Sequence, residues 1–292
     1  MNIKMENLIN KYSLTLEEGI EQKVKVIATN SHQYFTRENL ELLFRLIDLT
    51  SLNTDDNESF IKKLCQKVNG VDSHFDGIRN VAAVCVYPPL VETVSKNLED
   101  GNIQVAAVGG NFPTSQTYLS IKKAECKEII NHGADEVDIV LPIGEFMEGN
   151  YDVVYHEIKE IKEAIGNKKL KVILETGMLN DYRNIQLASL IAMEAGADFI
   201  KTSTGKMKPA ATYDAVYIMA QAIKAFYKHT GKTTGIKPAG GISTAEDALS
   251  YYAIVREILG DQWINSSLFR LGASRLANDL LGHIREEEIQ YF

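Results

Sequence analysis

Hydrophobic residues along the chain gather in short, nearly continuous apolar runs that alternate with longer segments of helical period. The runs VAAVCV, VDIVL and KVILE contain few polar residues. Strands that are buried on both faces have this pattern, as parallel strands beneath helices do. We therefore predict eight strands, at Arg45–Leu49, Val81–Val86, Ile103–Val108, Glu136–Leu141, Lys171–Glu175, Phe199–Thr202, Gly235–Pro238 and Phe269–Leu271.

The segments between these strands carry helix start and stop signals. Thr114 is the expected N-cap of one helix, Ser243 or Thr244 that of another, and a glycine follows most of the segments. Strands that alternate with helices in this way predict an α/β fold, a closed (β/α)8 TIM barrel, with an open doubly wound sheet as the alternative. The predicted helices are Ser115–Asn131, Tyr151–Ile165, Asp181–Ala195, Thr212–His229 and Ala245–Leu259.

The residues before the first predicted strand have a helical pattern of their own. We expect a helical N-terminal extension over residues 1–43, which covers the bottom of the barrel or a neighbouring subunit. The barrel is then expected over residues 44–292. The total length of 292 residues agrees with this division, because such a barrel takes about 250 residues.

Composition and charge exclude several classes of protein. Hydrophobic residues make up 45% and charged residues 24% of the chain, which is ordinary globular usage and excludes wholesale disorder. No apolar run approaches the roughly 18 residues of a membrane span, and the net charge of −8 disfavours broad binding to nucleic acid or anionic membranes. Cys65, Cys85 and Cys126 form neither a disulfide framework nor a zinc motif. Because the first residues also lack a secretory leader, we expect a cytoplasmic protein.

Two lysines lie within predicted strands that are neighbours in the barrel. Lys201 is in the sixth strand and Lys237 in the seventh, both among apolar residues. Burial and the repulsion of like charges lower a lysine pKa, and a shift from about 10.4 to near 7 requires about 4–5 kcal/mol. A neutral amine attacks carbonyl groups and forms a Schiff base. The alternative for either lysine is an ion pair with a carboxylate or a bound phosphate.

Acidic residues lie on two further strands. Alternation places Asp138 on one face of the fourth strand together with Glu136 and Val140. Asp138 is a candidate for proton transfer, or it forms an ion pair with a lysine. Asp48, near the end of the first strand, is either a site residue or a capping residue. Glu175 is an acid at the barrel mouth without an assigned role, and Cys85 reads as a small buried hydrophobe.

Glycine-rich loops follow the last three strands. Gly240-Gly241 follows the seventh strand, Gly272-Ala273-Ser274 the eighth, and Gly205-Lys206 the sixth. Loops after the last two strands, with an adjoining helix N-terminus, commonly hold phosphate in such barrels. No group of His, Cys and acidic residues has metal-ligand spacing, so the pattern favours a lysine mechanism without metal or cofactor over metal-assisted enolisation.

Seven motifs, in this order, resemble those of the deoxyribose-phosphate aldolase family, class I aldolases with a (β/α)8 barrel. The resemblance runs from about Leu43 to Leu281, and GADFIKTSTGK together with KPAGG is its most specific part. The motifs are LIDLTSLN (46–53), VAAVCVYP (81–88), GADEVDIV (133–140), LKVILETG (170–177), GADFIKTSTGK (196–206), GIKPAGGIST (235–244) and FRLGASR (269–275).

The resemblance implies a role for each matching residue. Lys201 would be the Schiff-base lysine, Lys237 the second lysine that depresses its pKa, and Asp138 the acid of a proton relay. The implied reaction is the reversible cleavage of 2-deoxy-D-ribose 5-phosphate to D-glyceraldehyde 3-phosphate and acetaldehyde, in a possible homodimer. Asp48 and Thr50 would lie near the sugar hydroxyls. The other implied substrate-binding residues are Cys85 and Thr204, with Gly205, Lys206, Gly240, Gly241, Gly272 and Ser274 around the phosphate.

The chain departs from the family pattern at three places. Many members have an arginine two residues after the GG pair, where this chain has Ser243, and a small hydroxyl residue after GAS, where it has Arg275. Our hypothesis is that the cation has moved from one loop to the other. Some members end in a tyrosine that assists proton transfer, but here Tyr291 is followed by Phe292, which leaves that role open.

Two other functions remain compatible with a phosphosugar-binding barrel, because one fold serves many functions. The first is an isomerase that uses carboxylate bases and needs no neutral lysine. The second is a phosphosugar-binding protein without catalytic activity, in which Lys201 is never modified.

Overall fold

The strands of the computed structural model, which describes residues 5–292, form one parallel sheet in the order β7-β6-β5-β4-β3-β2-β1-β8. Each strand is short and its residues are almost all buried, because the sheet has helices outside and side chains inside. The strands are β1 (Ile47–Thr50), β2 (Ala83–Val86), β3 (Gln104–Gly109), β4 (Glu136–Val140), β5 (Lys169–Ile173), β6 (Phe199–Lys201), β7 (Gly235–Lys237) and β8 (Leu271–Ala273).

Backbone hydrogen bonds between the first and last strands of this order close the barrel. The Arg270 N–H donates to the carbonyl of Ile236 over 3.1 Å, and the Gly272 N–H donates to the carbonyl of Pro238 over 2.9 Å. Isolated parallel bridges join the same two segments. The closed (β/α)8 barrel is therefore confirmed over the open sheet.

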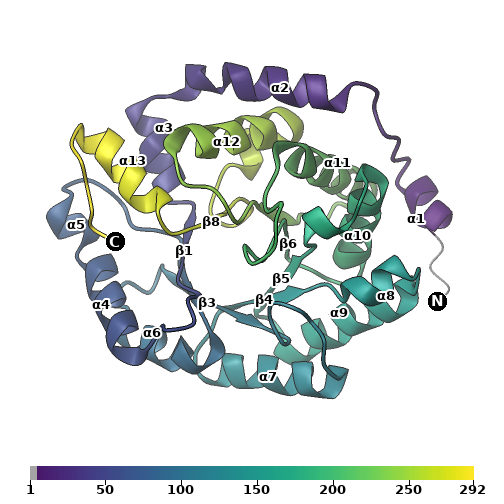
Figure 1. The fold of residues 1–292 in the computed structure, drawn as a ribbon, viewed down its shortest axis with the longest axis horizontal. Coiled ribbons are helices and arrows are strands. Elements are labelled where there is room, and N and C mark those ends of the chain that lie inside the picture. Colours follow the sequence, from purple (N-terminus) through teal and green to yellow (C-terminus); the bar gives the residue numbers. More distant parts are fainter. Residues whose placement is uncertain (1–4) are drawn as a thin grey trace.

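Helices surround the strands as an outer layer (Figure 1). Asp181, Thr212 and Thr244 cap three of them by accepting a backbone N–H bond. The α-helices that follow β1 in the chain are α4 (Glu58–Asn69), α5 (Val71–His74), α6 (Val91–Asn97), α7 (Leu119–Asn131), α8 (Ile143–Met147), α9 (Tyr151–Ile165), α10 (Tyr182–Glu194), α11 (Tyr213–Thr230), α12 (Ala245–Leu259) and α13 (Leu276–Arg285).

Most predicted elements have somewhat different bounds in the structure; the fifth strand, for example, is Lys169–Ile173 instead of Lys171–Glu175, and helix α7 and strand β8 show why. Helix α7 begins at Leu119 instead of Ser115, and its N-cap is Tyr118 instead of Thr114. Ser115 has a left-handed backbone with φ 59°, so a right-handed helix cannot begin at this residue. The eighth strand is shifted towards the C-terminus of the chain, from Phe269–Leu271 to β8, because its pairing with β1 begins at Leu271.

The N-terminal extension lies along the side of the barrel. Its helices are α1 (Met5–Lys11), α2 (Ile20–Asn30) and α3 (Arg37–Phe44). Helix α1 packs on α10, α2 on α11 and α12, and α3 on α13 and α12, so that the extension follows the outer helix layer (Figure 1). The expectation that it covers the bottom of the barrel is therefore wrong for α1 and α2. The boundary at residue 43 stays a prediction.

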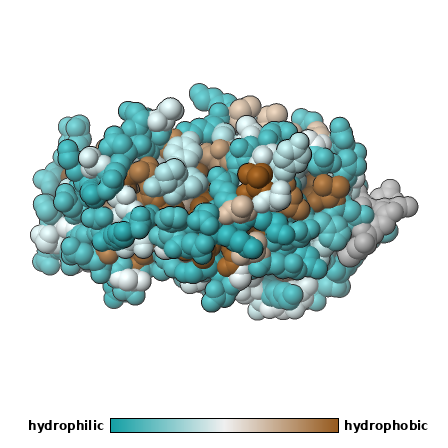
Figure 2. All heavy atoms as spheres, turned by 90° about the horizontal axis from the view of Figure 1, so that it is seen from below, coloured by the Kyte–Doolittle hydropathy of each residue, from teal (hydrophilic) through white to brown (hydrophobic). Residues whose placement is uncertain are grey.

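The face in Figure 2 is mostly hydrophilic, with small separate apolar areas. Among the described residues, no helix is long and apolar enough to cross a membrane.

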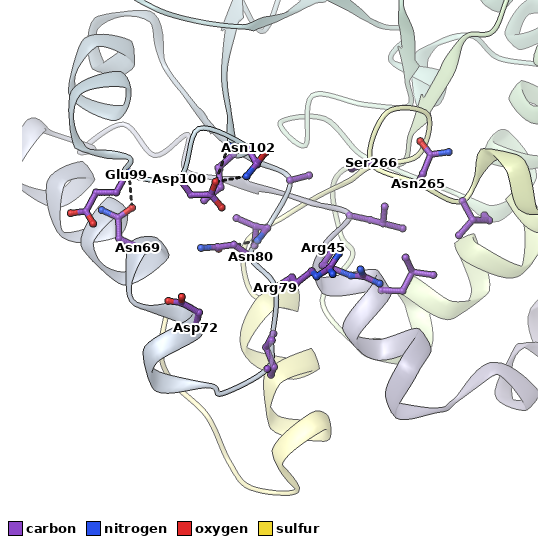
Figure 3. A pocket seen from close by; sticks show the side chains of 18 residues that line it. Arg45, Asn69, Asp72, Arg79, Asn80, Glu99, Asp100, Asn102, Asn265 and Ser266 are labelled. Atoms are coloured by element: carbon purple, nitrogen blue, oxygen red, sulfur yellow. Dashed lines mark hydrogen bonds between the residues drawn. The ribbon is translucent and has the colours of Figure 1, made fainter.

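The larger hollow described here, about 1100 Å³, lies where the strands begin. Asn69, Asn80 and Asn102 line it, but their side chains hold loops through hydrogen bonds (Figure 3). A smaller hollow of about 400 Å³ lies where the strands end. Residues at the strand starts of such barrels serve stability and those at the strand ends serve catalysis. The smaller hollow is therefore the candidate active site.

Candidate active site

The interior of the barrel holds a cluster of charged side chains between the two hollows. Strand alternation turns these side chains inward, and each is at most 3% exposed. Lys201 and Lys237 are paired across β6 and β7, so the predicted adjacency of these two lysines is confirmed. The other members are Asp48 of β1, Glu136 and Asp138 of β4, Lys171 of β5, and Arg270, which precedes β8.

Asp138 lies at the centre of this cluster and contacts three ammonium groups. The Lys171 Nζ lies 2.8 Å from its Oδ1, and the Nζ atoms of Lys201 and Lys237 lie 2.8 and 2.9 Å from its Oδ2. The carboxylate is fully buried, so these contacts replace its hydration. The observed contacts thus allow both predicted roles of Asp138, as an ion-pair partner of the lysines and as a group that transfers protons.

The charges in the cluster divide the three lysines into two kinds. Burial lowers the pKa of Lys201, Asp138 raises it, and the neighbouring Lys237 lowers it further, with a net decrease. Burial also lowers the pKa of Lys237, but Asp138 and Asp48 outweigh burial, and the net shift is upward. Lys171 has the same upward balance. Lys201 is therefore the lysine of this cluster that gives up its proton most readily, and a neutral amine can act as a nucleophile.

Lys201 also reaches the smaller hollow, which collects the ends of four strands. The lining brings together most of the residues expected to bind substrate. Asp48 and Cys85 are not among them, because both are fully buried. Neither side chain is exposed to this hollow, and a part for the two in substrate binding stays a prediction. The expected residues that do line it are Thr50, Thr204, Gly205, Lys206, Gly240, Gly241, Gly272 and Ser274.

Asp48 has a different place from the one expected. Its carboxylate lies 2.5 Å from the Lys237 Nζ and 2.5 Å from the Arg270 Nη1. It therefore holds the cluster together one layer below the pocket. Burial raises the pKa of the Cys85 thiol, so this side chain is a neutral neighbour of the lysines and is no competing nucleophile.

The loop after β6 is fixed by an acid that had no assigned role. Glu175 accepts hydrogen bonds from the Thr204 backbone N–H over 3.2 Å and from the Thr204 hydroxyl over 2.5 Å. The Lys206 Nζ donates to the carbonyl of Leu52 over 2.5 Å. These bonds place Thr204 and the Lys206 ammonium at the edge of the pocket.

The last residues of the chain lie over one side of the pocket. Phe292 lines it, while the Tyr291 hydroxyl donates to the carbonyl of Lys67 over 2.6 Å. The Asn278 side chain bonds the backbone of both residues. Arg275 lines the pocket and Ser243 is not part of its lining, which agrees with a cation on the β8 side.

Two basic residues of the cluster were missed from the sequence. Lys171 lies on the same face of β5 as Lys169 and Ile173, and the same alternation that placed Asp138 would have placed it inside. Arg270 falls within the predicted strand Phe269–Leu271 but is not among the predicted site residues; in the structure it precedes β8 and lies inside the barrel, 1% exposed.

One group of possible metal ligands exists among the described residues, away from this pocket. Ligand atoms of Glu246, Asp279 and His283 lie within 4.8 Å of one another. Asp279 accepts the Ala245 N–H over 2.7 Å at the N-terminus of α12, where the helix dipole favours an anion and disfavours a cation. The two carboxylates are explained by that helix end.

Comparison with known proteins gives the family. The sequence model of the DeoC/LacD family aldolases matches residues 42–256. The chain belongs to this family. It is 42% identical over 245 residues to the deoxyribose-phosphate aldolase of Homo sapiens, covering 80% of this chain and 77% of that protein. It is 41% identical over 245 residues to that of Bos taurus, with the same coverage of both chains.

The structure of this DeoC/LacD aldolase has neighbours with the same fold. The deoxyribose phosphate aldolase of Aeropyrum pernix, described as having a unique tetrameric structure, superposes with a TM-score of 0.67. It is 23% identical, and the match covers 89% of this chain and 97% of that one. The chain is thus an aldolase, a lyase that makes or breaks carbon–carbon bonds, on a TIM barrel.

Proposed function

We propose that this aldolase cleaves 2-deoxy-D-ribose 5-phosphate reversibly to D-glyceraldehyde 3-phosphate and acetaldehyde, through a Schiff base on Lys201. The observation that carries the proposal is the position of Lys201, between the buried Asp138 and the pocket, with a lowered pKa. The names of the relatives from Homo sapiens and Bos taurus support the substrate.

The mechanism follows from the contacts of Lys201. Its neutral amine attacks C1 of the open-chain sugar, and loss of water leaves an iminium ion beside the Asp138 carboxylate. Asp138 and Lys237, through a water, take the proton of the C3 hydroxyl, and the C2–C3 bond breaks with its electrons moving to the iminium. Protonation of the enamine at C2 and hydrolysis release acetaldehyde. Such a positioned acid–base pair contributes about 10²–10⁴-fold.

Trapping of the intermediate tests this proposal. The protein is incubated with acetaldehyde and borohydride, and its peptides are analysed by mass spectrometry. We expect a reduced two-carbon adduct on Lys201, because the neighbouring Lys171 and Lys237 are held protonated by their carboxylates. A folded protein without this adduct would overturn the proposal and favour the isomerase or the phosphosugar-binding protein.

The phosphate is proposed to bind at the glycine loops beside Lys206, Ser274 and Arg275. Gly240 has φ 86°, and a Cβ added there would lie 2.8 Å from the Ala210 Cβ and 3.0 Å from the Gly205 Cα. Gly240→Ala is therefore expected to push the two loops apart and raise KM for the phosphorylated substrate about tenfold or more.

Gly241→Ala is the matched control for this prediction. Gly241 has a similar φ of 83°, but an added Cβ would have no atom within 4 Å. Both variants should lose thermal stability from the left-handed backbone, as measured by melting temperature. Only Gly240→Ala should show the large change in KM, and equal KM values in the two would contradict the steric argument.

Arg275→Ala tests whether this side chain supplies the cation for the phosphate. A charged hydrogen bond to an anion contributes about 1.5–3 kcal/mol, so we expect KM for 2-deoxy-D-ribose 5-phosphate to rise roughly 10–100-fold. KM for unphosphorylated 2-deoxy-D-ribose should change little. If KM for the phosphorylated sugar is unchanged in the variant, the hypothesis of a displaced cation is wrong.

We also propose a homodimer in the cytoplasm. The three cysteines are buried and free, as in proteins of a reducing compartment, and they are Cys65, Cys85 and Cys126. Light scattering on the purified protein gives the number of subunits, and a monomer or tetramer would contradict the dimer. Fractionation of the source cells tests the compartment, since enzyme recovered outside the soluble cell fraction would contradict it.

A further inference from the structure

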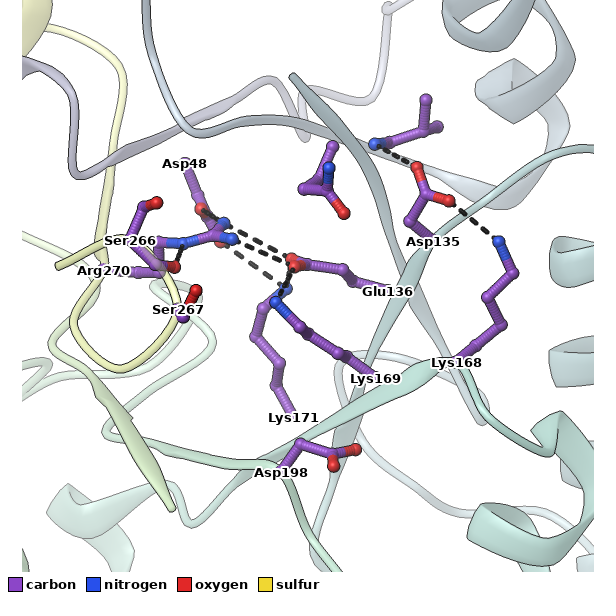
Figure 4. A network of polar contacts seen from close by, with 12 residues as sticks. Asp48, Asp135, Glu136, Lys168, Lys169, Lys171, Asp198, Ser266, Ser267 and Arg270 are labelled. Carbon is purple, nitrogen blue, oxygen red and sulfur yellow. Dashed lines mark hydrogen bonds and ion pairs between the residues drawn. The ribbon is translucent and has the colours of Figure 1, made fainter. Parts of the chain in front are cut away.

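The buried cluster extends well below Asp138. The Arg270 guanidinium contacts Asp48 through Nη1, over 2.5 Å, and Glu136 through Nη2, over 3.0 Å. The other oxygen of Glu136 lies 2.7 Å from the Lys171 Nζ, which also contacts Asp138. Figure 4 shows Asp48, Glu136, Lys171 and Arg270 converging on one another. A continuous chain of ion pairs therefore joins Arg270 to Lys201.

The number of charges in this cluster is odd. It contains three carboxylates, Asp48, Glu136 and Asp138, and four bases, Lys171, Lys201, Lys237 and Arg270. If all seven were ionised, the dry interior would carry one net positive charge, which is costly because no water solvates it. The cluster becomes neutral when one base loses its proton.

Contacts decide which base that is. Arg270 and Lys237 each meet two carboxylates, and Lys171 meets three within 3.5 Å. Lys201 meets only Asp138, and shares that oxygen with Lys237. It is the base with the fewest anionic partners, and so the one whose proton is released most easily.

We propose that Arg270 and Glu136 act as positioning residues which, by fixing the total charge of the cluster, determine whether the Lys201 amine carries a proton. This inference rests on the proposed role of Lys201 as the nucleophile. The charge of Lys237 alone does not account for the lowered pKa of Lys201, because Asp48 and Asp138 neutralise Lys237. Residues that never touch the substrate set the reactivity of the amine.

The groups that face Lys201 from the other strands agree with this picture. They are Asp138 of β4, Lys237 of β7 and the neutral Cys85 of β2, while Lys171 of β5 contacts Asp138 and Asp48 of β1 contacts Lys237. At the pocket edge stand Glu175, which is engaged by Thr204, and Lys206, which is bonded to Leu52. The pKa of Arg270 is raised because Asp48 and Glu136 outweigh its burial, so the proton stays on Arg270.

Two single variants should move the protonation of Lys201 in opposite directions. Arg270→Gln leaves three carboxylates with two cations besides Lys201, so its amine should hold a proton more tightly. Glu136→Gln leaves two carboxylates with three cations, so the amine should lose its proton more easily. The rate at which the Lys201 amine reacts falls at low pH, where the amine gains its proton, and we call this part of the pH profile the acid limb. One unit charge at this range in a protein interior shifts the acid limb by about one pH unit, upward in Arg270→Gln and downward in Glu136→Gln.

The double variant and an exposed neighbour supply the controls. Arg270→Gln with Glu136→Gln restores equal numbers of buried charges and should return the acid limb close to that of the wild type. Lys169 contacts the same Glu136, at 3.5 Å, but its side chain is 35% exposed. Lys169→Gln should therefore leave the acid limb in place, because solvent screens that charge.

The experiment measures the amine directly. Acetylacetone condenses with a neutral lysine, losing water, to give an enaminone that absorbs in the ultraviolet, and its rate of formation is followed against pH for each folded variant. Folding is checked by circular dichroism and melting temperature. The proposal is supported if the acid limb shifts in opposite directions in the two single variants and returns to the wild-type position in the double variant.

Two failures can be told apart. Enaminone on Lys201, with the same pH dependence in all variants, overturns the charge argument and leaves the aldolase mechanism intact. Absence of enaminone on Lys201 of the folded wild type, with peptide mapping as the readout, overturns the proposed function itself. If Arg270→Gln does not fold, Glu136→Gln and the double variant still decide, because a neutral cluster predicts that they differ by about one pH unit.

Discussion

Lys201→Arg is expected to abolish turnover of 2-deoxy-D-ribose 5-phosphate, with a loss of at least about 10⁴-fold in kcat. The guanidinium keeps its proton at every working pH, so it cannot form the Schiff base. It also returns a net positive charge to the cluster around Asp138, which meets Lys201 over 2.8 Å. The measurement is coupled detection of D-glyceraldehyde 3-phosphate release, with the melting temperature as a test of folding.

Lys201→Met is the matched control for the charge. Methionine has similar length and no charge, and the wild-type cluster is neutral when the Lys201 amine is neutral, so this variant should fold well. It should be as inactive as Lys201→Arg and should give no borohydride adduct at position 201. Turnover that survives Lys201→Met would show that the nucleophile lies elsewhere, as in an isomerase with carboxylate bases.

The sequence predicted the barrel well because strand burial leaves a clear trace. Runs such as VDIVL are apolar on the face that meets the helices, and the repeated alternation with helices permits few topologies. The path of the N-terminal extension was not predictable in the same way. Helix α2 has a buried stripe, with Ile20 and Val24, but a stripe does not say which partner covers it.

The part of the site near the ends of the strands was predictable from the sequence, but the deeper part of the charged cluster was not. Lys201 and Lys237 stood out as charges in apolar strands, and the structure pairs them. Arg270 was missed because it lies near a predicted strand boundary, where a shift of one or two residues turns a side chain in or out. Boundaries are set by pairing with neighbouring strands, which one segment does not reveal.

Asp138→Asn is expected to separate catalysis from nucleophile activation. The amide cannot balance the ammonium groups of Lys171 and Lys237, so a proton on Lys201 becomes less favourable and its amine stays neutral. Labelling of Lys201 by acetylacetone should therefore persist. Turnover should fall by about 10²–10⁴-fold, because the relay that takes the C3 hydroxyl proton is lost.

Stability gives a second measure for the same variant. Removing one member of a buried ion pair costs about 3–5 kcal/mol, so the melting temperature of Asp138→Asn should fall by roughly 5–15 °C near pH 7. Burial raises the pKa of Asp138, but Lys171, Lys201 and Lys237 outweigh it and hold the pKa well below the usual range. A carboxylate with a lowered pKa stabilises the fold above its unfolded pKa, near 3.9, and this contribution is lost as the pH falls through the folded pKa.

The difference in melting temperature between wild type and Asp138→Asn should therefore be constant from about pH 5 to 7 and narrow below about pH 4, because only the wild type has this stabilisation to lose. Scanning calorimetry across this range measures it. A difference that widens in acid would mean that Asp138 is protonated in the folded wild type. That result would contradict both its ion pairs with Lys171, Lys201 and Lys237 and the neutral cluster on which the reactivity of Lys201 is argued.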